Sequence, residues 1–312
     1  MANLLDRLRS RGALALLGYA LVYCVAYAWL ADRAASAAGE ALGVLIVFGG
    51  GFTLLAWSAT RGCAPRVVEV RAPRAESLLV LGYLALFAVG FLGVGLSAVR
   101  AAFPDEPLQN GAILLAKLAA MVVLPLWLFR LRGYRWRTLL DLAPGDRREW
   151  RALLVLCLAL GVFQLVVGRG PQMLAEVGAA PWQVALVAPL TFAWLTLEAG
   201  LTEEFLFRVL LQTRLAAWLR SETAAIVVMA LLFGLAHAPG YVLRGGYAFE
   251  GMAGPPDPLT AATYSIVVVS VIGFMFGVLW ARTRSLWLVV LVHGFTDTIP
   301  HLAEFVKLAF PR

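Results

Sequence analysis

Three ionisable side chains interrupt an apolar segment in the second half of the chain. Residues 201–210 read LTEEFLFRVL and contain Glu203, Glu204 and Arg208. Glu204 and Arg208 are four residues apart with the acid first, which predicts an ion pair on one face of a helix. Glu203 points about 100° away from Glu204 on such a helix. Because acids inside a membrane generally face a polar interior and serve a function, Glu203 is a candidate catalytic acid. The alternative is a carboxylate in water at the cytoplasmic interface.

All three histidines lie in the last quarter of the chain. His237 follows Phe233 in an FxxxH pattern, and His293 precedes Asp297 in an HxxxD pattern that occupies one helical face. His301 has no patterned partner and is interpreted as an interfacial residue. A single histidine near a span end is more often interfacial than catalytic, but three polar positions in neighbouring helices favour a shared site.

This set of side chains is suited to hydrolysis. A carboxylate beside an imidazole, here Glu203 and His237, can take a proton from water. A second imidazole with a polar neighbour, here His293 and Asp297, can donate hydrogen bonds to a developing oxyanion. The same residue types also bind zinc, in which case His237, His293 and Asp297 would be ligands and Glu203 the base. We expect no cofactor, with zinc as the alternative, and both versions would cut an amide bond.

The helices that carry these residues are predicted to cross a membrane. The chain has 312 residues, 61% of them hydrophobic, and a mean hydropathy of +0.82, which exceeds what one water-soluble core could bury. Roughly 20 apolar residues span the hydrocarbon as a helix. Nine segments qualify, at 13–31, 41–57, 78–99, 112–129, 152–167, 181 to about 215, 224–238, 261–281 and 285–300. The sequence therefore predicts an all-α, polytopic membrane helical bundle of about eight to nine transmembrane helices.

The positive charge is distributed as a topology signal. The formal net charge is +7, and eighteen arginines lie in the N-terminal tail and alternate loops, at 7–11, 61–74, 130–151, 214–220 and 282–284. The opposite loops hold four arginines. By the positive-inside rule, this asymmetry predicts a cytoplasmic N-terminus. The expected location is a bacterial cytoplasmic membrane. No basic and aromatic soluble module is visible, so a nucleic-acid partner is not expected.

Two predicted hairpins bring the polar residues to one depth. If spans six and seven turn near Arg220, Glu203 and His237 each lie 17 residues from the turn. A turn near Thr283 places His293 and Asp297 roughly 15 to 21 Å from their own hairpin tip, compared with roughly 25 Å for the first pair, so all four share one level if the first hairpin protrudes by about 5 to 10 Å. The long sixth helix would then project beyond the membrane surface.

The chain is predicted to divide at an arginine-rich linker. Residues 1–151 form N-terminal scaffold spans, in which Lys117 is placed near a span end and extends to the interface. Residues 152–312 form the catalytic bundle, which holds every histidine.

The three motifs together resemble a known family over about residues 181–300. EExxxR, FxxxH and HxxxD occur in the order and spacing of the CPBP family (CAAX protease and bacteriocin-processing, or Abi), which includes the type II CAAX prenyl endopeptidases. The resemblance implies water activation by Glu203 and His237, and oxyanion binding by His293 and Asp297. It also implies supporting roles for Glu204 and Arg208. Asp297 departs from the asparagine common in the prenyl-protein enzymes, and an ionised aspartate cannot donate a hydrogen bond.

These features predict an intramembrane endopeptidase of the glutamate type. Its partners would be the lipid bilayer and a membrane-anchored or lipidated peptide substrate. Two other classes remain open on the residues alone: a non-proteolytic immunity or scaffold protein, and a proton-coupled transporter, which is disfavoured because no internal repeat is apparent.

Overall fold

The structure, a computed structural model, describes residues 10–244 and 256–311 and is built from helices. No strand occurs among these residues, so the all-α prediction is confirmed. Arg7 and Arg9, which contribute to the predicted topology, lie outside the described residues.

Nine helices in the described part of the chain are long and apolar enough to cross a membrane, which confirms the predicted number of spans. They are Arg11–Arg33, Ala35–Ala59, Pro73–Ala102, Glu106–Leu131, Arg147–Val166, Pro181–Leu219, Glu222–Leu243, Pro258–Thr283 and Leu286–Ala309. The apolar stretches of the last two are 72 and 67% buried within the protein, whereas those of the other seven are 12 to 33% buried. Exposed apolar side chains on those seven helices suit a lipid environment, as expected for an integral membrane protein.

The helices group into two compact units that interleave along the chain. Unit 1 takes its described residues from Met1–Ser58, Val67–Ala98 and Phe207–Arg282. Unit 2 takes them from Ala59–Arg66, Val99–Leu206 and Thr283–Arg312. The predicted functional division at residue 151 stays a prediction.

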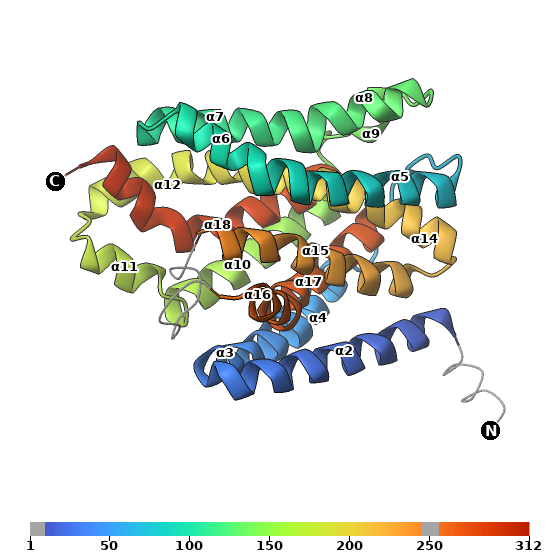
Figure 1. Cartoon of the computed structure of the whole chain (residues 1–312), viewed down its shortest axis with the longest axis horizontal. Coiled ribbons are helices and arrows are strands. Elements are labelled where there is room, and N and C mark those ends of the chain that lie inside the picture. The colour runs from blue at the N-terminus through green and yellow to red at the C-terminus, as the bar shows by residue number, and fades with distance from the viewer. Residues whose placement is uncertain (1–9, 245–255, 312) are drawn as a thin grey trace. The chain divides into compact units, whose positions relative to one another are not determined.

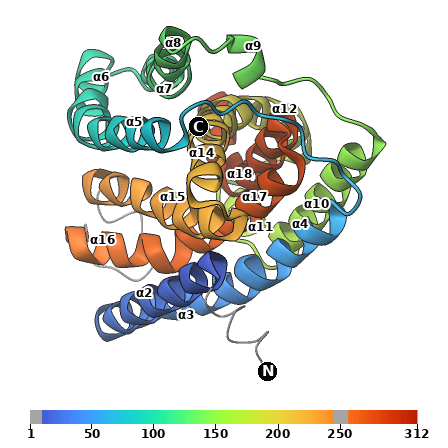
Figure 2. The ribbon, with the colours of Figure 1, turned by 90° about the vertical axis from the view of Figure 1, so that its right-hand side faces the viewer.

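Unit 1 is organised around α15 (Glu222–Arg244), which carries the FxxxH motif. This helix packs against α2 (Arg11–Arg33), α14 (Thr213–Leu219), α16 (Pro258–Tyr264) and the π-helical segment η7 (Ser265–Val269). Figure 2 shows α15 beside α14 and α16. The other elements of unit 1 are α3 (Ala35–Val44), η1 (Leu45–Phe52), α5 (Pro73–Leu86), η2 (Phe87–Gly95) and α17 (Ser270–Thr283). Three further elements lie at the divisions between units: α4 (Thr53–Ala59), α6 (Leu96–Ala102) and η5 (Phe205–Gln212), and α17 also ends one residue beyond unit 1, at Thr283.

Unit 2 is organised around α18 (Leu286–Ala309), which carries the HxxxD motif. In Figures 1 and 2, α18 runs alongside α10 (Arg147–Val166) and α12 (Pro181–Leu195), and it also contacts α11 (Gly170–Glu176) and η4 (Thr196–Leu201). The other elements are α7 (Glu106–Leu118), η3 (Ala119–Val123), α8 (Leu124–Leu131), α9 (Trp136–Leu139) and α13 (Thr202–Glu204). The HxxxD motif is therefore held by the most buried of the spanning helices in its unit.

Both predicted turns are present. Arg220 ends α14 with φ of 50°, and Arg284 follows α17 with φ of 50°, a left-handed conformation that ends a helix. The sixth span, Pro181–Leu219, is 39 residues long. At 1.5 Å per residue its length is about 58 Å, well above the roughly 30 Å of a hydrocarbon core. The long sixth helix is thus confirmed, while the shared depth of the polar residues stays a prediction.

Candidate active site

The two adjacent glutamates lie in a part of the sixth span that departs from regular α-helix. They occupy the short helix α13, between the π-helical segments η4 and η5. At the start of α13, the Thr202 hydroxyl donates to the Glu198 carbonyl at 2.5 Å, which offers the wider π turn an additional hydrogen bond. π-helical turns are rare and are frequent at functional sites, because they change which way the following side chains point.

Two glycines allow η4 and α18 to approach closely. A Cβ atom added at Gly200 would lie 2.6 Å from the Val290 carbonyl oxygen, and one added at Gly294 would lie 2.7 Å from the Cα of Thr196. Any larger residue at either position would push the two helices apart. Small residues at helix interfaces serve this purpose in membranes. The close approach is what brings the glutamates of the sixth span to the histidine of the ninth.

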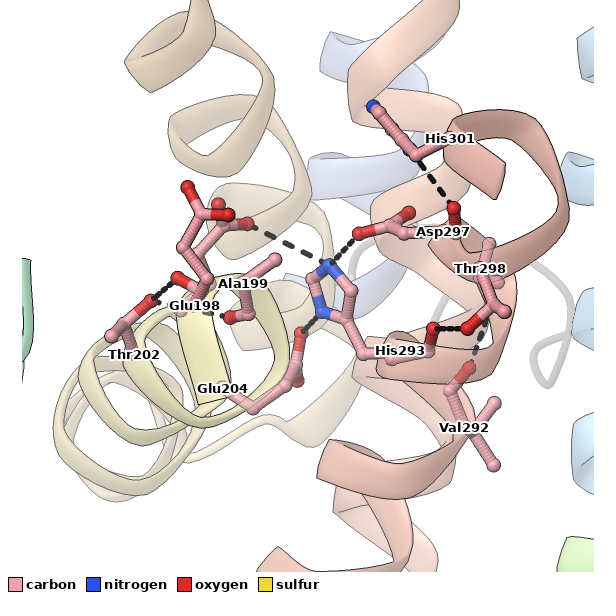
Figure 3. Close-up of polar contacts among 12 residues, drawn as sticks. Glu198, Ala199, Thr202, Glu204, Val292, His293, Asp297, Thr298 and His301 are labelled. Carbon is pink, nitrogen blue, oxygen red and sulfur yellow. Dashed lines mark hydrogen bonds and ion pairs between the residues drawn. The ribbon is translucent and has the colours of Figure 1, made fainter. Parts of the chain in front are cut away.

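His293 is the centre of the site in unit 2. Its Nδ1 atom is 2.8 Å from Oε1 of Glu204, and its Nε2 atom is 3.4 Å from Oδ2 of Asp297 and 3.8 Å from Oε2 of Glu203. Figure 3 shows the imidazole ring between Glu204 on one side and Asp297 on the other. The structure thus brings together four of the residues that the sequence motifs single out: Glu203, Glu204, His293 and Asp297.

The two glutamates differ in exposure as well as in position. The Glu204 side chain is fully buried, whereas Glu203 is 15% exposed and Asp297 is 28% exposed. Because a carboxylate accepts hydrogen bonds, its contact with Nδ1 requires that nitrogen to carry the hydrogen. Glu204 therefore fixes the orientation of the imidazole, and Nε2 is the ring nitrogen turned toward the two more accessible acids.

Sequence reasoning did not find the contact between Glu204 and His293. It assigned Glu204 to Arg208 by helical spacing alone, and that pairing stays a prediction because the two residues lie in different units. The signal available in the sequence was a pair of glycines: Gly200 lies one turn before the glutamates, and Gly294 lies next to the histidine.

The FxxxH motif is an internal contact of unit 1. His237 Nδ1 is 2.8 Å from the Phe233 carbonyl oxygen, and the two rings lie 4.9 Å apart. The carbonyl is an acceptor, so in the neutral ring Nδ1 carries the hydrogen and Nε2 carries the lone pair. Buried Arg208 lies with its guanidinium carbon 5.0 Å from the centre of the Phe233 ring, a cation–π distance. Phe233 therefore contacts both the histidine and the arginine of the motifs within unit 1.

Lys117 is not placed as the sequence predicted. It lies in the middle of a span that begins at Glu106, not near a span end, and its ammonium group is 2.9 Å from Oε1 of Glu198. The other carboxylate oxygen of Glu198 accepts a hydrogen bond from the Trp194 indole at 3.0 Å. The predicted span began at residue 112, six residues after the helix starts at Glu106, so Lys117 was predicted to lie near its end. The ion pair instead connects α7 to η4, the segment that precedes the glutamates.

The remaining predicted residues add no ligand set for a metal. His301 is exposed, and its Nδ1 atom is 2.9 Å from the Asp297 carbonyl oxygen on the same helix (Figure 3). Within residues 10–244 and 256–311, no group of three or more His, Cys, Asp or Glu side chains is arranged to hold a metal ion. The alternative zinc set of His237, His293 and Asp297 draws on both units and stays a prediction.

Residues 185–299 match the family described as type II CAAX prenyl endopeptidase Rce1-like. The matched segment is about a third of the chain and contains all three motifs, from Glu203 to Asp297. No curated protein and no solved structure matches the chain. The family match, the nine apolar helices of the described residues and the acid-flanked histidine agree with one another: residues 185–299 of this integral membrane protein are similar to the type II CAAX prenyl endopeptidases of the Rce1-like family.

Proposed function

We propose that the protein is a glutamate-type intramembrane endopeptidase that hydrolyses a peptide bond in membrane-embedded or lipid-modified protein tails. The observation that carries this proposal is the arrangement around His293. One nitrogen is held by a buried carboxylate, and the other is turned toward two partly exposed acids. A histidine oriented in this way can present a hydrogen to an oxygen that becomes negative during reaction.

Glu203 is the proposed base. It is the more accessible of the two glutamates and is not the one that holds His293 Nδ1. A base must reach water or substrate, and a fully buried carboxylate engaged with its own histidine is poorly suited to that role. Glu204 is then a supporting residue, as the family resemblance also implies.

His237 is the second proposed partner of the attacking water. Its Nδ1 contact with the Phe233 carbonyl leaves Nε2 as the nitrogen with a lone pair in the neutral ring. The motif spacing, rather than the geometry, links His237 to Glu203 in this proposal. Arg208 and Phe233 pack around this part of the motif as supporting residues.

The proposed reaction has two proton transfers. Glu203, with His237, takes a proton from water, and the resulting hydroxide attacks the carbonyl carbon of the scissile bond. The carbonyl oxygen becomes an oxyanion that receives a hydrogen bond from His293 Nε2–H. Because Nδ1–H donates to Glu204 at the same time, His293 acts here as an imidazolium, whose charge is balanced by the Glu204 and Asp297 carboxylates. The C–N bond then breaks, and the proton held by the base passes to the leaving amine. The products are a new carboxylate and a new amino group.

The membrane restricts the substrates. Peptide bonds inside a helix are shielded by their own hydrogen bonds, so the cleaved segment must be unwound or terminal. A lipidated tail at the membrane surface meets this condition. The proposed setting is a bacterial cytoplasmic membrane, and the distribution of arginines in the loops supports an N-terminus in the cytoplasm.

Proteolysis is tested directly with the purified protein in liposomes. We expect it to cleave a farnesylated peptide with a C-terminal CAAX sequence and to leave the same peptide without its lipid largely intact. In water enriched in ¹⁸O, mass spectrometry should find one ¹⁸O atom in the newly formed carboxyl group, because water supplies that oxygen. Failure to cleave either peptide or any other membrane-anchored tail, together with proton-coupled flux across the liposomes, would favour the transporter alternative.

Asp297→Asn separates the metal-free version of the mechanism from the zinc version. An asparagine NH₂ can donate to an oxyanion, so the metal-free version predicts that the variant keeps kcat within about tenfold of the wild type. Strong chelators should have little effect on the wild type. In the zinc version the aspartate is an anionic ligand, so its loss should remove both metal and activity. Stoichiometric zinc in the purified protein, lost together with activity in Asp297→Asn, would establish the zinc version.

A further inference from the structure

The helix that carries His293 and Asp297 contains a proline one turn later. Pro300 lies inside α18 and has no backbone N–H group. In a regular helix, the N–H of residue 300 would donate to the carbonyl oxygen of Thr296, four residues earlier. Pro300 therefore leaves the Thr296 carbonyl without its usual donor. A carbonyl in an apolar environment is costly without a hydrogen-bond partner, and a side-chain donor can replace the missing N–H group.

Gln164 of α10 supplies the missing hydrogen bond. Its Nε2 atom donates to the Thr296 carbonyl oxygen at 2.5 Å, and Gln164 is 5% exposed. Gln164 continues the buried stripe of α10 formed by Ala152, Leu156 and Leu160, which points the amide at α18. A buried polar residue in an otherwise apolar stripe is costly unless it is hydrogen-bonded, so its role is specific to this contact.

The Gln164 amide can face the Thr296 carbonyl only with its NH₂ group, because its oxygen is an acceptor. Its Oε1 atom is buried without a hydrogen-bond partner. If the amide were reversed, Oε1 would face the Thr296 carbonyl, and two acceptors would repel each other. The donor orientation is therefore the stable one.

The contact acts on the peptide group next to Asp297. The Thr296 carbonyl and the Asp297 N–H belong to one planar peptide unit. A rotation of the carbonyl therefore also moves the backbone nitrogen and the Cα atom of Asp297. Neighbouring carbonyls in the same turn are also held by side chains: Val292 by the Thr296 hydroxyl at 2.8 Å, and Gly294 by the Thr298 hydroxyl at 2.6 Å. Of these three carbonyls, only that of Thr296 accepts its side-chain hydrogen bond from a residue of another helix.

We propose that Gln164 is a positioning residue that sets the orientation of Asp297 relative to His293 by replacing the hydrogen bond that Pro300 removes. This inference rests on the proposed peptidase function of the His293 site. It predicts that Gln164 affects turnover more than substrate affinity, because it acts on Asp297, the acid beside the histidine nitrogen that donates to the oxyanion, and not on a surface that binds the substrate.

Gln164→Met tests the proposal with a side chain of similar size that has no donor. We expect kcat to fall roughly tenfold, with KM within about twofold of the wild type, since one buried carbonyl loses its partner. Gln172→Met is the matched control, because Gln172 is an exposed glutamine in the same unit that contacts Glu176. The control variant should keep wild-type kcat.

The effect of Gln164→Met should also be measured in a protein that carries Pro300→Ala. Alanine restores the backbone N–H to the Thr296 carbonyl and is well tolerated in helices, so this variant should fold. When Gln164→Met is added to Pro300→Ala, it should change kcat by less than about twofold. An equal loss in both backgrounds, or wild-type kcat for Gln164→Met in the natural background, would overturn the proposal and leave Gln164 as a packing residue.

Thermal unfolding separates this inference from the proposed function. Gln164→Met should lower the Tm more in the natural background than in the Pro300→Ala background, whatever reaction the protein performs. If the wild type cleaves no peptide but this difference in Tm is found, the hydrogen bond to Thr296 is established and the peptidase function fails. If the wild type cleaves peptides and the variants show no coupling in either kcat or Tm, the positioning role fails alone.

Discussion

Glu203→Gln is expected to lower kcat by about 10²- to 10⁴-fold while the protein still accumulates in the membrane and unfolds at a Tm close to that of the wild type. The size of the effect is that of removing a general base. The small effect on folding follows from the position of Glu203, which is partly exposed and lies 3.8 Å from His293 Nε2. The measurements are turnover of a lipidated peptide in liposomes and thermal unfolding in detergent.

Glu204→Gln is the matched comparison, because it makes the same chemical change at the adjacent residue. The glutamine oxygen can still accept from His293 Nδ1, but the buried negative charge is lost. We expect kcat to fall by roughly tenfold and the Tm to decrease, since hydrogen bonds to charged groups contribute about 1.5 to 3 kcal/mol. The opposite pattern, near-normal turnover for Glu203→Gln and an inactive Glu204→Gln, would reverse the assignment of base and support.

The number of spans and their turns could be predicted from sequence because both are local properties. An apolar run of about 20 residues identifies a spanning helix wherever it lies in the chain. The turns at Arg220 and Arg284 follow from short polar breaks between such runs. The motif residues could also be selected, because ionisable groups are expensive within a membrane and few are present.

The partner of each motif residue could not be predicted in the same way. Helical spacing reports only neighbours within one helix, whereas Glu204 and His293 are 89 positions apart. Their contact depends on how closely η4 approaches α18, which is set by Gly200 and Gly294. The π-helical turns before and after the glutamates add a second obstacle, because a spacing argument assumes 3.6 residues per turn throughout.

The prediction for Lys117 was wrong because the start of its helix was predicted too late. The apolar run begins at residue 112, but the helix begins at Glu106, next to Pro107, a residue suited to the first turn of a helix. The earlier start moves Lys117 from the end of the span to its middle, where it pairs with Glu198. The compact units are also interleaved along the chain, and such grouping depends on contacts between distant segments that the sequence does not reveal.

His293→Asn is expected to lower kcat by about 10²- to 10³-fold, the size of the loss when one oxyanion donor is removed. An asparagine amide occupies roughly the position of Nδ1, so it can still donate to Glu204, and the variant should stay folded. It has no atom at the position of Nε2, which faces Asp297 and Glu203.

His293→Gln makes the complementary change. The longer amide reaches the region of Nε2 and loses the contact with Glu204, so we expect more residual activity than in His293→Asn but a lower Tm, because Glu204 is left buried without that partner. Turnover and thermal unfolding of the two variants therefore separate the two nitrogens. If His293→Asn retained near-wild-type kcat, Nε2 would not be the oxyanion donor. Glu203 and Asp297 would then face a histidine whose role is to hold the sixth and ninth spans together, and another group would have to stabilise the oxyanion.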